Sequence, residues 1–310
     1  MSNEKSEKLS STSSELHYHY AGMTNTGMVR DHNEDAYMLP AETDPDILAQ
    51  KGHLYVLADG MGGHQKGEIA SAITIETVNQ EYYTRSNNHT TETQKDTIAD
   101  ALSDAIQMAN QQVMNATQGG GTTIIASVLY SDTIVAMNVG DSRAYLLRDG
   151  KLRLLSKDHS LVSRLVEMGK ITEEEALSHP RRNVLYQALG QGGDLEIYTV
   201  TEKIQLNDVI ILCSDGLWGE IGDQAIADVL STVSNPFVAA QQLIDMANQS
   251  GGPDNITAII IKVSDQEPPA DGYSPQIKSP LPPTALDDTQ PSMAIIPKHE
   301  KPDTPPEWED

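Results

Sequence analysis

The sequence predicts an α+β fold in which two antiparallel sheets stack against each other and helices lie on the outside. Strand-like apolar segments come in consecutive runs joined by short turns, and helical segments come in pairs between these runs. The regular strand–helix alternation that is typical of a doubly wound parallel sheet does not occur in the pattern.

The first half of the chain predicts three strands followed by two helices. We expect strands at 17–24, 36–39 and 53–59 and helices at 67–85 and 91–117. The second helix has one continuous apolar stripe, because apolar residues recur every three or four positions: Ile98, Leu102, Ala105, Ala109, Val113 and Ala116. Thr91 and Gln94 predict a capping box at its start.

The second half begins with four closely spaced strands, at 122–130, 133–140, 143–148 and 151–156. The short connections SD, GDS and DG predict a meander of antiparallel hairpins. After a mixed segment, the pattern predicts further strands at 195–204, 208–216 and 255–264, and helices at 223–231 and 236–248.

Composition divides the chain into three parts. Residues 1–16 are polar and predicted to be flexible, and 17–264 are expected to form a single domain. Residues 265–310 are acidic and contain most of the prolines, which predicts a disordered tail.

The net charge of −24 counts against nucleic acid and anionic membranes as partners. The single cysteine, Cys213, excludes an intramolecular disulfide, and we expect it to be a buried, inert thiol. The N-terminus lacks the apolar segment of a signal peptide, and no apolar run is long enough to span a membrane. These features predict a soluble cytoplasmic protein.

Five aspartates lie at the ends of apolar strands, each beside a turn: Asp35, Asp59, Asp141, Asp215 and Asp254. One such residue alone is usually a turn residue that bonds its own backbone. Together they indicate a site, because strand ends of stacked sheets meet at one rim, where several carboxylates repel unless cations lie between them. Oxygen ligands without a Cys or His cluster favour Mg²⁺ or Mn²⁺ over zinc.

Other motif interpretations fail on spacing. The segment DGMGGH has no P-loop lysine, and GQGG and QGGGTT do not connect a strand to a helix as a dinucleotide fingerprint does. The sequence contains neither an EF-hand loop nor the G-x-S-x-G of a hydrolase serine.

Seven motifs, in order, resemble the type 2C metal-dependent serine/threonine protein phosphatases, bacterial branch: TGMVRDHNEDAY, LADGMGGHQKGEIAS, GGGTT, VGDSRAYLLRDGKL, SKDHSLV, CSDGLW and GPDNIT. The resemblance covers residues 18–263. It implies a four-layer α-β-β-α sandwich with a binuclear Mn²⁺ or Mg²⁺ centre at one end of the sheets.

The resemblance also implies roles for individual residues. Asp59 would bridge two cations, and the Gly60 carbonyl would bind one of them. The other implied ligands are Glu34 and Asp35 (directly or through water), Asp215 and Asp254 at the second cation, and Asp141 with Asp215 at a possible third. Arg30 would bind the substrate phosphate, unless it only forms a surface ion pair with Asp31 or Glu34.

The implied activity is hydrolysis of phosphoserine and phosphothreonine in proteins by a metal-activated water, which needs no covalent phosphoenzyme. The expected partners are phosphorylated proteins, including a Ser/Thr kinase that the enzyme opposes, and a monomer is expected. His64 is a candidate general acid, with a structural role left open. The alternative function is a non-catalytic regulator that binds phosphoproteins or a partner through the same cleft or the tail.

The segment 160–185 corresponds to the flap of this family. It predicts a helix that stops at Gly169 and a second helix with a Thr172–Glu175 capping box. We expect Asp158 to be the N-cap of the first helix and His159 to support the fold. Four basic residues lie on a segment that either receives phosphorylated substrates or is simply a solvated loop: Arg164, Lys170, Arg181 and Arg182.

Overall fold

The computed structural model describes residues 16–62, 66–84 and 94–268. The predicted capping box at Thr91, the candidate general acid His64, the N-terminal 1–15 and most of the predicted tail lie outside these ranges. The chain divides into two units, 1–280 and 281–310, and the second falls entirely outside the described residues. All helices and strands of the described residues therefore belong to the first unit.

The first unit contains two antiparallel sheets. One has the order β1 (His17–Asn25), β11 (Ile256–Ser264), β10 (Val209–Cys213), β7 (Arg143–Arg148) and β8 (Lys151–Leu154). The other has the order β2 (Asp35–Met38), β3 (His53–Met61), β5 (Ile124–Tyr130), β6 (Thr133–Val139) and β9 (Tyr198–Lys203), and β4 (Gly121–Thr122) pairs with β3.

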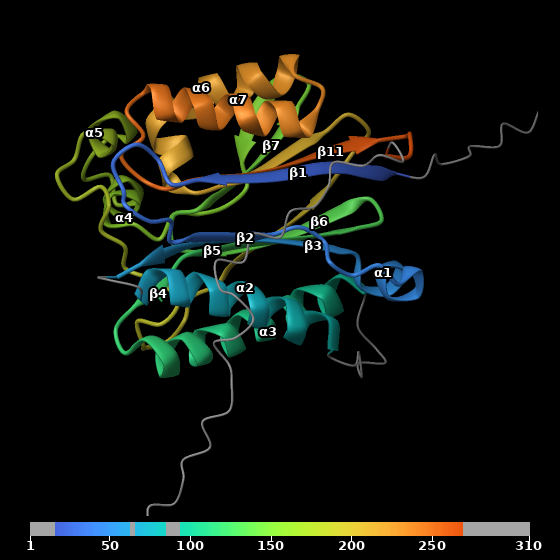
Figure 1. The fold of residues 1–310 in the computed structure, drawn as a ribbon, viewed down its shortest axis with the longest axis horizontal. Coiled ribbons are helices and arrows are strands. Elements are labelled where there is room, and N and C mark those ends of the chain that lie inside the picture. Colours follow the sequence, from blue (N-terminus) through green and yellow to red (C-terminus); the bar gives the residue numbers. More distant parts are fainter. Residues whose placement is uncertain (1–15, 63–65, 85–93, 269–310) are drawn as a thin grey trace, which may run out of the picture. The chain divides into compact units, whose positions relative to one another are not determined.

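Helices cover the outer face of each sheet, so the predicted four-layer sandwich is confirmed (Figure 1). Helices α6 (Asp215–Thr232) and α7 (Pro236–Gln249) pack on the five-stranded sheet that contains β1 and β11. Helices α2 (Lys66–Thr84) and α3 (Gln94–Thr117) pack on the other. Three short helices complete the described fold: α1 (Pro45–Lys51), α4 (Leu161–Glu167) and α5 (Glu173–Leu177).

Three apolar layers hold the sandwich together. Strand β10 shows how one segment serves two of them: Ile211 and Cys213 pack toward α6 and α7, whereas Ile210 and Leu212 pack between the sheets. All five residues of β10 are buried, and its apolar run therefore does not alternate with polar residues. Cys213 is a buried free thiol, as predicted.

The predicted meander of hairpins is wrong at its middle connection. Strands β5 and β6 form one hairpin and β7 and β8 another, but β6 pairs with β9 and β7 pairs with β10. The turn after β6 therefore crosses from one sheet to the other, and Asp141 lies on this crossing. A short turn sequence alone does not distinguish a hairpin from a crossing between stacked sheets.

Two helical segments differ from the prediction. Helix α6 begins at Asp215 instead of 223, with a non-helical Gly222 (φ 74°) between its two parts. The turn-like DG and the nearby glycines obscured its first part. Helix α1 was not predicted, although its start has two common helix signals. The Asp44 side chain accepts a hydrogen bond from Asp46 N–H, and proline occupies the first turn.

In the described part of the chain, no helix is both long and apolar enough to cross a membrane.

Candidate metal centre

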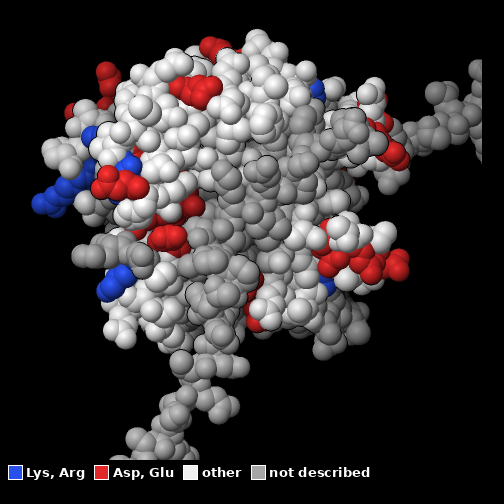
Figure 2. Space-filling model, viewed as in Figure 1, with Lys and Arg blue, Asp and Glu red and all other residues white. Residues whose placement is uncertain are grey.

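The five predicted aspartates come from the same end of the two sheets. Asp35 and Asp59 are direct cross-strand partners in the β2–β3 pair. Asp141 follows β6, Asp215 follows β10 as the first residue of α6, and Asp254 precedes β11. Acidic side chains also show on the surface of this side of the molecule, near the α4–α5 segment (Figure 2).

The main chain of Asp59 is fixed by the GGGTT segment. Its carbonyl accepts hydrogen bonds from Thr123 N–H (2.8 Å) and Thr122 Oγ1 (2.8 Å), and its N–H donates to Thr123 Oγ1 (3.1 Å). Thr123 Oγ1 also lies 2.7 Å from Oγ of Ser142, the neighbour of Asp141. A hydroxyl pair thus connects the strand end at Asp59 with the crossing at Asp141.

Glycine is required at 60 and 67 by close approach. A Cβ on Gly60 would lie 2.2 Å from the carbonyl oxygen of Gly67 and 2.6 Å from that of Glu34. A Cβ on Gly67 would lie 2.5 Å from Oε1 of Glu34. The start of α2 can therefore pack directly against Gly60 and Glu34 only because positions 60 and 67 have no side chain.

Asp35 and Glu34 each have a buried oxygen without a hydrogen bond. Ser214 Oγ (2.9 Å) and Thr257 Oγ1 (2.6 Å) both donate to Oδ2 of Asp35, while its Oδ1 has no hydrogen-bond partner. Glu34 Oε1 accepts no hydrogen bond and lies 3.5 Å from Nε2 of His32. Buried oxygens of this kind are unfavourable unless a cation satisfies them.

Burial and mutual repulsion raise the pKa values of four of these aspartates, Asp35, Asp59, Asp141 and Asp215. Burial, together with Asp215 and Asp254, raises the pKa of Asp35 to about 7, against the opposing hydrogen bonds of Thr257 and Ser214. Burial and Asp254 raise the pKa of Asp215 to about 6. Burial and neighbouring carboxylates also raise the pKa values of Asp59 and Asp141 well above the usual range of an aspartate. The cluster thus disfavours its own negative charge unless positive charge is supplied.

Arg30 pairs with Asp254, and not with Asp31 or Glu34 as the surface-pair alternative proposed. Its Nη2 donates to Oδ2 of Asp254 at 2.7 Å, and half of its side chain (47%) is exposed. Burial alone would lower the pKa of Arg30, but the charge and hydrogen bond of Asp254 raise it. One exposed guanidinium therefore lies directly beside the carboxylates.

Within the described residues, no three His, Cys, Asp or Glu side chains already surround a single point that would hold a metal ion. The donor set nonetheless fits a hard divalent cation. It consists of carboxylate oxygens, two of them buried without a hydrogen bond, and burial together with repulsion raises the pKa values of Asp35 and Asp59. Positive charge between them would satisfy the free oxygens and offset the repulsion.

The flap segment is partly as predicted. Helix α4 ends before Gly169 (φ 65°), and α5 begins with the predicted Thr172–Glu175 capping box. The N-cap prediction for Asp158 is wrong: Ser160 caps α4, and Asp158 accepts bonds from Arg143. His159 is fully buried and accepts from Gly140 N–H (3.3 Å), as a residue that supports the fold does.

Several supporting residues were not assigned from the sequence. The Asn255 side-chain oxygen accepts a hydrogen bond from Glu34 N–H, and its side-chain NH2 donates to the carbonyls of Thr26 and His32. These bonds fix the segment that carries Arg30. Trp218 Nε1 donates to the Asp141 carbonyl (3.0 Å). Both lie inside the motifs GPDNIT and CSDGLW, but their function depends on contacts between distant segments, which spacing does not reveal.

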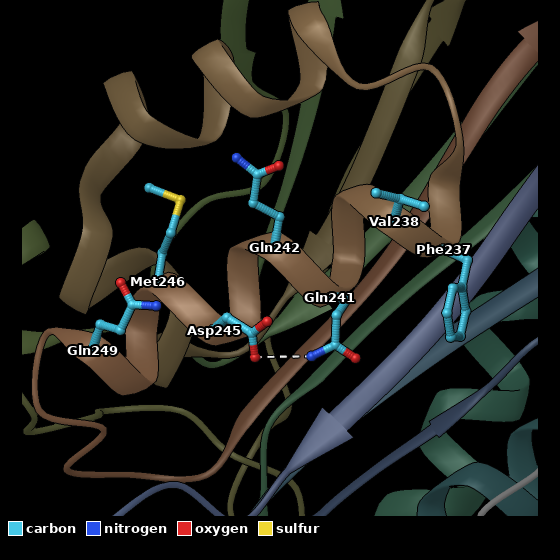
Figure 3. Close-up of a pocket in the computed structure, with 7 residues that line it drawn as sticks. All are labelled: Phe237, Val238, Gln241, Gln242, Asp245, Met246 and Gln249. Carbon is cyan, nitrogen blue, oxygen red and sulfur yellow. Dashed lines mark hydrogen bonds between the residues drawn. The ribbon is translucent and has the colours of Figure 1, made fainter.

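A hollow lies along α7 between Phe237 and Gln249, lined by residues of that helix (Figure 3). Its one carboxylate, Asp245, accepts a hydrogen bond from Gln241 (2.9 Å), and the remaining lining is amide and apolar. This lining has no set of groups for general acid–base or metal chemistry, in contrast to the cluster at the strand ends.

The model of the family described as protein phosphatase 2C matches residues 32–250. The chain belongs to the protein phosphatase 2C family. It is 34% identical over 247 residues to the serine/threonine phosphatase Stp of Listeria welshimeri, which covers 77% of this chain and 93% of the relative.

Two solved structures of this family are also similar. The S. agalactiae serine/threonine phosphatase matches with a TM-score of 0.71 at 33% identity, over 79% of this chain and 99% of the other. A PstP catalytic domain in complex with two manganese ions matches with a TM-score of 0.66 at 31% identity, over 80% and 99%. The family and the fold agree with the sequence-based prediction.

Proposed function

We propose that this chain is a metal-dependent phosphatase that hydrolyses phosphoserine and phosphothreonine in proteins. The observation that carries the proposal is the gathering of strand-end carboxylates beside the exposed Arg30, within a protein phosphatase 2C fold. The similarity to named serine/threonine phosphatases over most of the chain supports it.

The residues that would hold the cations are the oxygen donors of the cluster. Asp59 would bind two cations, with the Gly60 carbonyl at one of them and Asp215 and Asp254 at the other. Glu34 and Asp35 would bind directly or through water, and Asp141 with Asp215 would hold a third. Bound divalent cations supply charge neutralisation for phosphoryl oxygens and lower the pKa of water.

Arg30 would bind the phosphate of the substrate. Its guanidinium remains charged and can donate two parallel hydrogen bonds to phosphate oxygens. Arg30 is exposed and already pairs with an anion, the Asp254 carboxylate. Substrate binding would therefore only replace this carboxylate with the phosphate. His64, the candidate proton donor for the leaving alkoxide, lies outside the described residues.

The cysteine chemistry agrees with hydrolysis by water. Cys213 is fully buried, and burial raises the pKa of its thiol, so it is not a nucleophile that a phosphoprotein could reach. Water would then form the new P–O bond and give up a proton, the P–O bond to the serine or threonine would break, and the leaving oxygen would take a proton.

We propose that Mn²⁺ or Mg²⁺ serves as the cation, that two or three are bound, and that the enzyme is a cytoplasmic monomer. Its partners would be the phosphorylated substrates of a Ser/Thr kinase and the kinase itself. The domain would comprise 17–264, with a flap at about 160–185 and a tail at 265–310.

The test is phosphate release from a phosphothreonine peptide with Mn²⁺, with Mg²⁺ and with a chelator. We expect release with a divalent cation and almost none in chelator. A folded protein that binds the peptide but releases no phosphate under any condition would contradict the proposal and support a non-catalytic regulator. Undiminished release in chelator would contradict metal dependence alone.

A further inference from the structure

The residues immediately before Arg30 are apolar and strongly exposed. Met28 is 69% exposed and Val29 is 68% exposed, on the connection between β1 and β2. Among the described residues, the other adjacent pair of exposed large apolar side chains is Phe237 and Val238 on α7, each 48% exposed. Single exposed apolar residues are common on protein surfaces, whereas a fixed, adjacent pair beside a site suggests a contact surface.

The backbone that carries this pair is held in place. Met28 N–H donates to the Gly252 carbonyl at 2.7 Å. The Asn255 side-chain amide donates to the Thr26 carbonyl (2.9 Å) and the His32 carbonyl (3.0 Å), on both sides of the pair. All these bonds lead to the turn that carries Asp254, so the connection cannot fold over to bury Met28 and Val29 without breaking them.

Two glycines allow this close attachment. Gly27 has a φ of 82°, and a Cβ there would lie 2.1 Å from the carbonyl oxygen of Asp254. Gly252 has a φ of 50°, and a Cβ there would lie 2.9 Å from Cγ of Met28. Met28 therefore rests directly on the backbone of the turn, and the apolar pair has a fixed position relative to Arg30 and Asp254.

We propose that Met28 and Val29 bind an apolar side chain next to the phosphorylated residue of the substrate. The inference rests on the proposed function, because it takes Arg30 as the phosphate-binding group. Consecutive Cα atoms are about 3.8 Å apart, so the residues next to a phosphothreonine bound at Arg30 lie within a few ångströms of it and can reach Val29 and Met28. Contact with an apolar side chain removes the exposed apolar surface from water.

Charge favours the same kind of substrate. The chain has a net charge of −24, so even with cations bound in the carboxylate cluster the protein as a whole would repel a segment with several acidic residues around its phosphate. The residues before Arg30 offer no positive charge to compensate. An uncharged apolar neighbour gains contact without this repulsion.

The experiment compares two phosphothreonine peptides of equal charge, with leucine or with asparagine on both sides of the phosphothreonine. The aryl phosphate p-nitrophenyl phosphate serves as a substrate without neighbouring residues. We expect kcat/KM of the unmodified enzyme to be roughly five- to tenfold higher for the leucine peptide, from the apolar area of such a contact. The double variant Met28→Gln/Val29→Asn should lose this preference and keep its activity on the aryl phosphate.

The matched control is Phe237→Gln/Val238→Asn, which changes the other exposed apolar pair. It should keep the preference, and thermal melting should show both double variants folded. Activity without a preference in the unmodified enzyme, or a preference that survives in Met28→Gln/Val29→Asn, would overturn this inference alone. An equal loss on both peptides and the aryl phosphate would also overturn it, because the pair would then only support Arg30. Absence of phosphate release from all three substrates would overturn the proposed function as well.

Discussion

Arg30 and Asp254 form an ion pair in which Nη2 lies 2.7 Å from Oδ2. The proposed phosphate-binding group is thus paired with a proposed metal ligand. The Asp254 carboxylate stands 32% exposed and the Arg30 side chain 47%, so both can reach an incoming partner. A cation bound at Asp254 would take the place of Arg30 as the positive partner of this carboxylate. A phosphate bound at Arg30 would take the place of Asp254 as the negative partner of the guanidinium. Binding of the cation should therefore favour binding of the phosphate.

Replacing Arg30 with alanine should mainly weaken substrate binding. We expect KM for a phosphothreonine peptide to rise roughly 10- to 100-fold, as for loss of a charged hydrogen bond, while part of kcat remains. Calorimetry should show Mn²⁺ still bound, because the carboxylates are unchanged. Arg30→Lys keeps the positive charge but cannot donate two parallel hydrogen bonds, so its KM should lie between those of the unmodified enzyme and Arg30→Ala. Loss of cation binding in Arg30→Ala would instead make Arg30 a support of the carboxylate cluster.

The metal-free protein should become less stable as pH rises. Folding raises the pKa of Asp35 to about 7 and that of Asp215 to about 6, from an ordinary value of 3.8. Between about pH 4 and 7 the folded state therefore holds more protons than the unfolded state, and its free energy of unfolding falls as they are lost. Melting temperatures in chelator should decline across this range, and added Mn²⁺ should restore stability at pH 7 to 8. A melting temperature in chelator that rises with pH would contradict the repulsion described for this cluster.

The sequence predicted the layers and the positions of the aspartates because both depend on local patterns. The runs of apolar residues mark the strands, and each aspartate directly follows or precedes such a run. Glycines that fit a close approach, such as Gly60, also lie beside these runs. Roles that the family resemblance implied for individual residues remain predictions.

What the sequence did not predict depends on contacts between distant segments. The turn at Asp141 has the composition of a hairpin, and only the pairing of β6 with β9 and of β7 with β10 makes it a crossing. Asp158 lies at a suitable position for an N-cap, but Arg143, 15 residues earlier, is its partner. Local propensity for capping is worth about 1 kcal/mol, and a buried bidentate ion pair outweighs it.

Arg143 should be important for stability. Burial alone would lower its pKa, but the hydrogen bonds and charge of Asp158 raise it, and the guanidinium also stacks 3.4 Å from the centre of the Trp218 ring. Arg143→Met would leave Asp158 mostly buried without its partner, which costs about 3–5 kcal/mol of unfolding free energy. Denaturant unfolding measures this cost.

The control for Arg143 is Lys203→Met, which breaks the exposed pair of Lys203 with Asp132. Exposed pairs contribute about 0–1 kcal/mol, so this variant should be nearly as stable as the unmodified protein. Equal stability losses in the two variants would show that burial of the Arg143–Asp158 pair has no special effect.

Asp59→Asn should remove activity while the fold remains. The bonds that fix Asp59 come from its main-chain N–H and carbonyl, which the substitution leaves in place, and the amide has nearly the same shape. An asparagine cannot ionise beside Asp35 and Asp215, which together with burial raise the pKa of Asp59, so the metal-free protein should be at least as stable as the unmodified one, with a gain that grows as pH rises. Turnover of a phosphothreonine peptide with Mn²⁺ should fall by about a thousandfold or more, because both cations would lose a shared ligand.

Asp245→Asn, which removes an exposed carboxylate from α7, should keep full activity with Mn²⁺. Undiminished turnover in folded Asp59→Asn would mean that the carboxylate at the end of β3 does not hold the cations of this enzyme.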